Sequence, residues 1–231
     1  MNRPRVAIDA LLLRPRPTGV GRAILDWTRA LAARDHGLDF AVLCTHPELL
    51  DHLAGRPGWT LVPCPGARGG TLRKAAWTQM RMPGLLRELG ADLLHTMQFI
   101  APLRSPCPRV VTVHDLGYLR FPHTVEQPRS AYYRLLVPRS LAAAAAVVTN
   151  SRATRDDVRA RFPGLGDRVV ATPFGRPQWV DHQPPHPSHR PERAPFLFVG
   201  TLEPRKNLEG LLGAYGDFLA ERRDSGRFSP D

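Results

Sequence analysis

The chain has 231 residues, of which 42% are hydrophobic and 23% charged, a composition typical of a soluble globular protein. Its formal net charge of +11 comes from 30 Arg and two Lys, which are scattered along the sequence without forming a basic block. This pattern disfavours nucleic acid as the partner and favours phosphorylated ligands or an anionic membrane surface.

The three cysteines show no Cys-x-x-Cys spacing, so the usual signatures of a zinc site or a disulfide framework are excluded. No apolar run reaches the ~18–20 residues that a membrane span needs. Asp9 and Arg14 interrupt the apolar residues at the amino terminus, which predicts a first strand rather than a signal peptide. We therefore expect a cytoplasmic protein that can associate peripherally with the inner face of the membrane.

Short β-favouring runs alternate with helical patterns as far as residue 172. Strands are predicted at 6–13, 39–45, 59–62, 92–96, 109–113, 145–149 and 169–172. Helices are predicted after Thr18, at 47–53, at 71–89 with a break at Pro83 and Gly84, at 130–144 with a kink at Pro138, and at 151–162. A loop is expected at 116–128. This alternation predicts an α/β fold with a doubly wound parallel sheet.

The segment 178–195 differs in kind, since it holds five Pro, three His and almost no aliphatic residues. We interpret it as a linker between a domain at 1–177 and the beginning of a second domain at 196–231. Prolines separate His182, His186 and His189, so no helix can align them as metal ligands. Beyond the linker, a strand at 196–200 and a helix at 208–219 form one βα unit, which we expect to be poorly packed because it is too small to fold independently.

The stretch at 109–115 is the centre of the functional hypothesis. A β-favouring run ends abruptly in His114 and Asp115, which places both residues at the carboxyl end of a predicted strand. In open parallel sheets, ligands bind just beyond these ends. A histidine in such a position can equally be a hydrogen-bonded structural residue, and other motifs must decide between the two interpretations.

Four motifs together favour the functional interpretation of His114, because their order and separations resemble those of glycosyltransferase family 4. They are Thr18-Gly-Val-Gly-Arg, Val111-Thr-Val-His-Asp, Asn150-Ser-Arg-Ala-Thr-Arg-Asp-Asp and Gly200-Thr-Leu-Glu-Pro-Arg-Lys-Asn-Leu. The resemblance implies a GT-B fold, with a complete Rossmann-like acceptor-side domain followed by a truncated donor-side domain. It also implies transfer of a sugar, with retention and without a metal or other cofactor, from a nucleotide-activated donor to a glycan, lipid-linked or small-molecule acceptor.

The resemblance assigns roles on the first domain. Gly19 and Gly21, with Arg22 beside them, match the loop that approaches the donor diphosphate, although an ordinary tight turn explains these glycines equally well. His114 matches the family histidine that contacts the donor sugar, so we assign it a positioning role in catalysis. Asp115 and His95 are predicted to bind substrate, and Phe99 and Ile100 to line the acceptor side, with plain core packing as the alternative.

On the second domain, Arg205 and Lys206 match a basic pair that binds the diphosphate and stabilises the leaving group. The family's later Glu motif does not occur in this chain, and Thr201 stands where many relatives carry another Arg. We therefore expect a chain that is inactive alone and needs a missing half from another chain. The competing hypothesis is a non-catalytic basic α/β module that binds a phosphorylated ligand or a partner protein.

Overall fold

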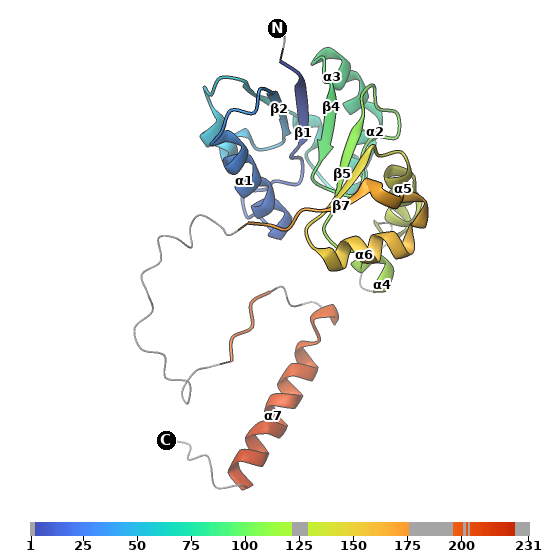
Figure 1. Ribbon diagram of the computed structural model, residues 1–231. Coiled ribbons are helices and arrows are strands. Elements are labelled where there is room, and N and C mark those ends of the chain that lie inside the picture. The colour runs from blue at the N-terminus through green and yellow to red at the C-terminus, as the bar shows by residue number, and fades with distance from the viewer. Residues whose placement is uncertain (1–2, 122–128, 176–195, 201, 203, 225–231) are drawn as a thin grey trace.

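Seven parallel strands form one sheet, in the order β3-β2-β1-β4-β5-β6-β7 (Figure 1). The computed structural model describes residues 3–121, 129–175, 196–200, 202 and 204–224. The strands are β1 (Arg5–Asp9), β2 (Asp39–Cys44), β3 (Trp59–Pro63), β4 (Leu93–Thr96), β5 (Arg109–Val113), β6 (Ala146–Thr149) and β7 (Val169–Ala171). The predicted doubly wound sheet is therefore confirmed, with each predicted strand within a few residues of its place.

The longer helices follow the prediction, and the structure adds short helices that were not predicted. The helices are α1 (Gly19–Ala32), η1 (Pro47–Leu53), η2 (Pro65–Ala67), α2 (Thr71–Met80), α3 (Met82–Glu88), α4 (Gly117–Arg120), α5 (Arg129–Ala142), α6 (Arg152–Arg161) and η4 (Pro163–Arg168), followed by η7 (Pro204–Lys206) and α7 (Leu208–Asp224). The break between α2 and α3 falls at Arg81, because Pro83 sits in the first turn of α3, where its missing N–H is not needed. The segment 47–53 is a 3₁₀ helix, and the short helix α4 occupies part of the predicted loop.

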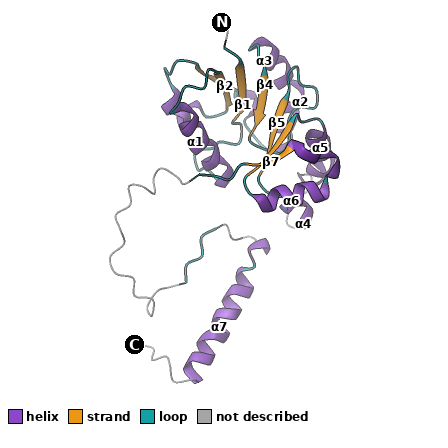
Figure 2. Cartoon of the chain, in the orientation of Figure 1, coloured by secondary structure: helices purple, strands orange, loops and turns teal. Residues whose placement is uncertain are grey.

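Helices cover both faces of the sheet and bury a separate core on each face (Figure 2). Side chains alternate along β1, so Ile8 packs with Ile24 of α1 on one face. Ala7 faces the other way and belongs to the core that includes Leu86 of α3 and Leu141 of α5. Strands buried on both faces explain the continuous apolar runs in the sequence.

The chain reverses its direction of travel across the sheet between β1 and β4. From β1 the strand order runs outward through β2 to β3 on one side, and from β4 through β7 on the other. Asp9, at the end of β1, lies in register with Thr96, at the end of β4. Open α/β sheets bind ligands in the crevice beyond the carboxyl ends of the strands at such a switch point. These two residues therefore mark where a site is expected.

The prediction of a strand at 196–200 is wrong, since none of these residues is in a strand. A strand needs a neighbour to satisfy its backbone groups, and here Phe196 packs instead on α7, with its ring 5.2 Å from that of Tyr215. Apolar side chains of this segment are exposed, Leu212 at 62%, as expected for a unit too small to bury them. The predicted linker and its three histidines lie outside the described residues, and the domain boundaries stay predictions.

No helix in the described part of the chain is both long and apolar enough to cross a membrane.

Candidate functional site

A cavity of about 310 Å³, which we call the switch-point cavity, lies beyond the carboxyl ends of the central strands. Its lining residues are Leu12, Arg14, Thr18, Val20, Gly69, Thr71, Lys74, Ala75, Thr78, Gln98, Phe99, Ile100, His114, Tyr132 and Tyr133. They come from the loops after β1 and β4, the residue after β5, the loop before α2, and helices α1, α2 and α5. Thr18 and Val20 flank Gly19 and line this cavity together with His114, so the glycine loop and His114 lie at the same edge of the sheet.

His114 is a neutral hydrogen-bonding group in the wall of this cavity. Its Nε2 lies 3.1 Å from the carbonyl oxygen of Met97, which can only accept, so Nε2 carries the proton and Nδ1 keeps its lone pair. Burial lowers the pKa of His114, while the bond to Met97 and the charge of Asp115 act in the opposite direction. Near neutral pH the ring therefore offers an acceptor rather than a positive charge.

Asp9 lies beneath the cavity. Among the described residues it is the only buried carboxylate, with 2% of its surface exposed. Its Oδ1 accepts a hydrogen bond of 3.0 Å from the backbone N–H of Leu11. Its Oδ2 lies 3.0 Å from the Thr96 hydroxyl and 2.9 Å from Nε2 of Gln98. Burial raises the pKa of Asp9, and these hydrogen bonds oppose the rise. The carboxylate thus joins the ends of β1 and β4.

Charged and aromatic groups complete the cavity. Nζ of Lys74 donates a 2.9 Å hydrogen bond to the carbonyl oxygen of Leu11, which holds this cation in the cavity wall beside exposed Arg14. The rings of Tyr132 and Tyr133 lie 5.7 Å apart, and Phe99 packs edge-on against Tyr133 at 5.2 Å. Apolar rings with a few fixed polar groups are the usual lining of a small-molecule site.

The two predicted glycines have different surroundings. A side chain added at Gly21 would place its Cβ 3.0 Å from Cβ of Pro17, so this glycine lets the loop after β1 pack on α1. Nothing lies within 4 Å of the corresponding position at Gly19, which is exposed at the first turn of the helix. Gly19 therefore leaves room for a ligand at the helix start, and Arg22 is exposed one turn further on.

A matched pair of substitutions tests this difference. Gly21→Val should lower the free energy of unfolding by about 1–3 kcal/mol, because the added atoms collide with Pro17. Gly19→Val should change it by only about 0.5 kcal/mol, because the space around Gly19 is open. Chemical denaturation of both variants measures the two values. Equal losses would show that the packing of the loop on α1 does not depend on Gly21.

His95 does not line the cavity. It is 9% exposed, and its Nε2 lies 2.9 Å from the Thr112 hydroxyl. Its ring packs edge-on against Trp27 of α1 at 4.7 Å, on the face of the sheet that α1 covers. Burial lowers the pKa of His95 to about 4. The structure therefore places His95 in the core, and we leave it out of the proposed site.

The remaining predicted residues are divided between cavity and surface. Phe99 and Ile100 line the cavity, and their place on the acceptor side stays a prediction. Asp115 is exposed, and its Oδ1 accepts a 2.8 Å hydrogen bond from the backbone N–H of Gly117, so it shapes the turn into α4. Lys206 is exposed on η7 and does not line the cavity, and the side chain of Arg205 lies outside the described part.

Several groups in the site were missed from sequence. Asp9 could have been predicted from the sequence, because a carboxylate at the end of an apolar strand is seldom buried unless it has hydrogen-bonding partners. No sequence pattern predicts the place of the other missed residues, because their positions depend on how helices and loops pack. These residues are Lys74, Gln98 and Tyr132. Among the described residues, no group of three or more His, Cys, Asp or Glu side chains is placed to hold a metal ion.

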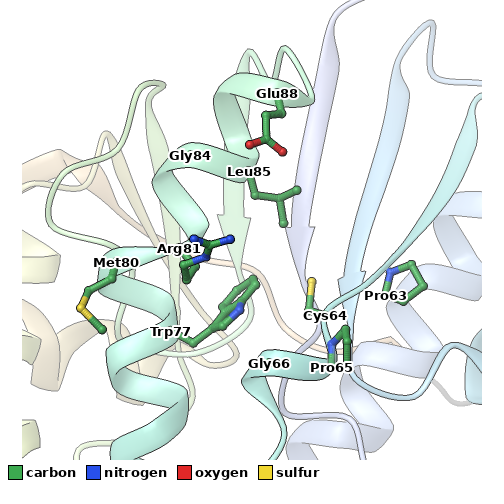
Figure 3. Close-up of a pocket in the computed structure, with 10 residues that line it drawn as sticks. All are labelled: Pro63, Cys64, Pro65, Gly66, Trp77, Met80, Arg81, Gly84, Leu85 and Glu88. Atoms are coloured by element: carbon green, nitrogen blue, oxygen red, sulfur yellow. The ribbon is translucent and has the colours of Figure 1, made fainter.

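A second cavity, of about 300 Å³, lies near the edge of the sheet and contains none of the predicted residues (Figure 3). Trp77, Arg81 and Glu88 line it from α2, α3 and the break between them, and Cys64 and Pro65 lie across from these side chains. It is not at the switch point, because it lies beside β3, the edge strand. The switch-point cavity is therefore the better candidate.

The fold and this cavity define a doubly wound α/β protein whose candidate ligand site lies at the switch point of the sheet. The model of Glycosyltransferase Family 4 matches residues 17–176, which is more than half of the chain. The chain belongs to this family, and the predicted GT-B assignment is confirmed.

Individual proteins are similar over part of the chain. O-antigen chain mannosyltransferase B of Escherichia coli is 29% identical over 155 residues, which cover 62% of this chain and 37% of the relative. A glycosyltransferase from Rickettsia africae ESF-5 aligns with a TM-score of 0.44 and 11% identity, over 76% of this chain and 44% of that one. UGT89C1 of Arabidopsis thaliana, solved with UDP-L-rhamnose, aligns with a TM-score of 0.48 and 12% identity, over 76% and 52%. The chain thus spans about two fifths of the length of its curated relative.

Proposed function

We propose that this chain supplies the acceptor-side wall of a retaining hexosyltransferase that moves a sugar from a nucleotide-activated donor to a glycan acceptor. The observation that carries the proposal is the meeting of the glycine loop after β1 with His114 in one cavity of a family 4 chain. The similarity to a mannosyltransferase of O-antigen chains makes mannose the first donor sugar to test, and cell-envelope polysaccharide the first acceptor class.

Each group of the cavity then has a task. Aromatic rings of Phe99, Tyr132 and Tyr133 offer apolar faces to the C–H side of a sugar ring. His114 positions the donor sugar through Nδ1. The start of α1 beside Gly19 favours an anion, because its N–H groups and helix dipole point outward. Lys74 and Arg14 add positive charge for a phosphate-bearing donor or acceptor.

Among the described residues, the predicted donor-side cation Lys206 does not line this cavity. When the bond to the donor phosphate breaks, negative charge grows on the leaving oxygen and needs fixed cations nearby. Arg205 and Lys206 are the candidates for these cations, and Lys206 is exposed on η7. We therefore propose that transfer is metal-independent, that this chain alone does not catalyse sugar transfer, and that donor-side residues from another chain complete the site.

We also propose a cytoplasmic location with peripheral contact to an anionic membrane surface. The net charge of +11 supports this proposal.

Ligand mapping by NMR tests where the sugar binds. A ¹⁵N-labelled chain is titrated with a mannose disaccharide, and the amide shifts of the two cavities are compared. We expect the changes to concentrate at Thr18, Gln98 and His114, with little change at Trp77 and Glu88. Changes around Trp77 and Glu88 alone would contradict the proposal. Binding of inorganic phosphate without any sugar would favour a non-catalytic phosphate-binding module.

A further inference from the structure

Gln98 is the side chain whose orientation the buried carboxylate of Asp9 controls. It is half-buried, lines the switch-point cavity, and follows β4 by two residues. Its Nε2 donates a 2.9 Å hydrogen bond to Oδ2 of Asp9. An ionised carboxylate only accepts hydrogen bonds, so the NH₂ end of the Gln98 amide must face Asp9.

Burial raises the pKa of Asp9 and so opposes the ionised state that this orientation needs, whereas the hydrogen-bond donors around the carboxyl group favour that state. A backbone N–H, a hydroxyl and an amide approach its two oxygens at 3.0, 3.0 and 2.9 Å. Three converging donors stabilise a negative charge and leave little lone-pair capacity unused. Lys74 also favours the charge electrostatically. The carboxylate is thus satisfied from within the protein, and its remaining effect on the cavity is the orientation of Gln98.

With the NH₂ end committed to Asp9, the amide oxygen of Gln98 is the atom left for a ligand. Within the described residues, Oε1 of Gln98 accepts no hydrogen bond. An amide oxygen without a protein partner in the wall of a cavity is available to accept a hydrogen bond from a ligand hydroxyl. The neighbouring residue, Phe99, and Tyr132 line the same cavity, and their rings suit the C–H face of a pyranose.

We propose that Gln98 is a specificity-determining residue whose Oε1 accepts a hydrogen bond from one hydroxyl of a pyranose bound in the switch-point cavity, and that Asp9 is the positioning residue that sets its amide. This inference rests on the proposed function, because it assigns the acceptor sugar to this cavity. It goes further, because it identifies Oε1 of Gln98 as the atom that recognises a sugar hydroxyl and Asp9 as the group that orients the Gln98 amide. No bond is made or broken by either residue.

The first part of the test needs no ligand. The side-chain amide signal of Gln98 is assigned in ¹⁵N spectra by its disappearance in Gln98→Leu. Asp9→Asn keeps the shape of the side chain but places an NH₂ group where Gln98 met an oxygen, so the amide should turn and its signal should shift strongly. Asp92→Asn is the matched control, because Asp92 accepts from the backbone N–H of Arg5 at the opposite edge of the sheet. That variant should leave the Gln98 signal in place.

The second part uses methyl α-mannopyranoside and its monodeoxyfluoro analogues, titrated against the full chain by NMR. Fluorine cannot donate a hydrogen bond, so one analogue should bind the unmodified chain about five- to tenfold more weakly than the parent sugar. Gln98→Leu and Asp9→Asn should bind the parent about five- to tenfold more weakly and should no longer discriminate against that analogue. Asp92→Asn should behave like the unmodified chain.

Three results would overturn the inference: no analogue is discriminated by the unmodified chain, discrimination persists in Gln98→Leu, or a folded unmodified chain binds no pyranoside. The last result would leave the proposed transferase function standing, since sugar transfer is measured separately. Thermal unfolding checks that each variant is folded. If Asp9→Asn unfolds, Gln98→Leu still decides the outcome, because Gln98 is only half-buried.

Discussion

Acidification from pH 7 to pH 4 should lower the free energy of unfolding by about 3 kcal/mol through His95 alone. Burial lowers the pKa of this histidine from 6.5 to about 4. Below pH 6.5, His95 therefore binds a proton in the unfolded chain, whereas in the folded chain it stays neutral until about pH 4. The unfolded state gains this proton throughout that window, so stability falls as the pH falls from 6.5 to 4 and has no further loss from His95 below it.

Urea unfolding of the chain at pH 7 and at pH 4 measures this effect. His95→Phe keeps an aromatic ring against Trp27 but cannot titrate, so its acid loss should be about 3 kcal/mol smaller than that of the unmodified chain. Thr112→Val removes the hydroxyl that lies 2.9 Å from Nε2 while His95 stays buried, and it should keep the full acid loss. If His95→Phe lost as much stability on acidification as the unmodified chain, burial of His95 would not be the cause.

The architecture could be predicted because its signals are local. Strand β5 ends where β-favouring residues give way to His114 and Asp115, and Ser151 caps α6 by accepting a 3.0 Å hydrogen bond from the N–H of Thr154. Both patterns are visible within a few residues. The segment 196–200 has the same local strand preference, but a strand also needs a partner, and local preference says nothing about one.

The site could be predicted only in part, because neighbouring strand residues face opposite sides of the sheet. His95 comes one residue before the end of β4, and this position directs it toward Trp27 rather than into the cavity. Gln98 lies three residues further on, beyond the end of β4, where the alternation of side chains between the two faces of the sheet no longer predicts its direction. Tyr132 and Tyr133 belong to a helix whose apolar residues predict packing, and only the arrangement of α5 over the sheet brings both rings to the cavity.

Replacing His114 in a complete transferase should reduce sugar transfer by about 10²–10³-fold, the usual cost of removing one hydrogen-bonding group that stabilises a transition state. Residues 1–175, which contain all seven strands, would be fused to the part of E. coli O-antigen chain mannosyltransferase B that the similarity does not cover. His36→Ala is the matched control, because Nε2 of His36 also lies close to a backbone carbonyl, that of Leu31 at 3.0 Å, but on the exposed surface.

Transfer from a nucleotide-activated mannose to a mannose oligosaccharide, followed by mass spectrometry, is the most direct measurement of the central claim. We expect no product from the 231-residue chain alone, product from the fused protein and from its His36→Ala variant, and almost none from His114→Ala. Product at an undiminished rate from the His114→Ala fusion would contradict the claim that the switch-point cavity is the transferase site. A fused protein that binds the donor but makes no product, alongside an active E. coli enzyme, would contradict the claim that this chain supplies the acceptor-side wall.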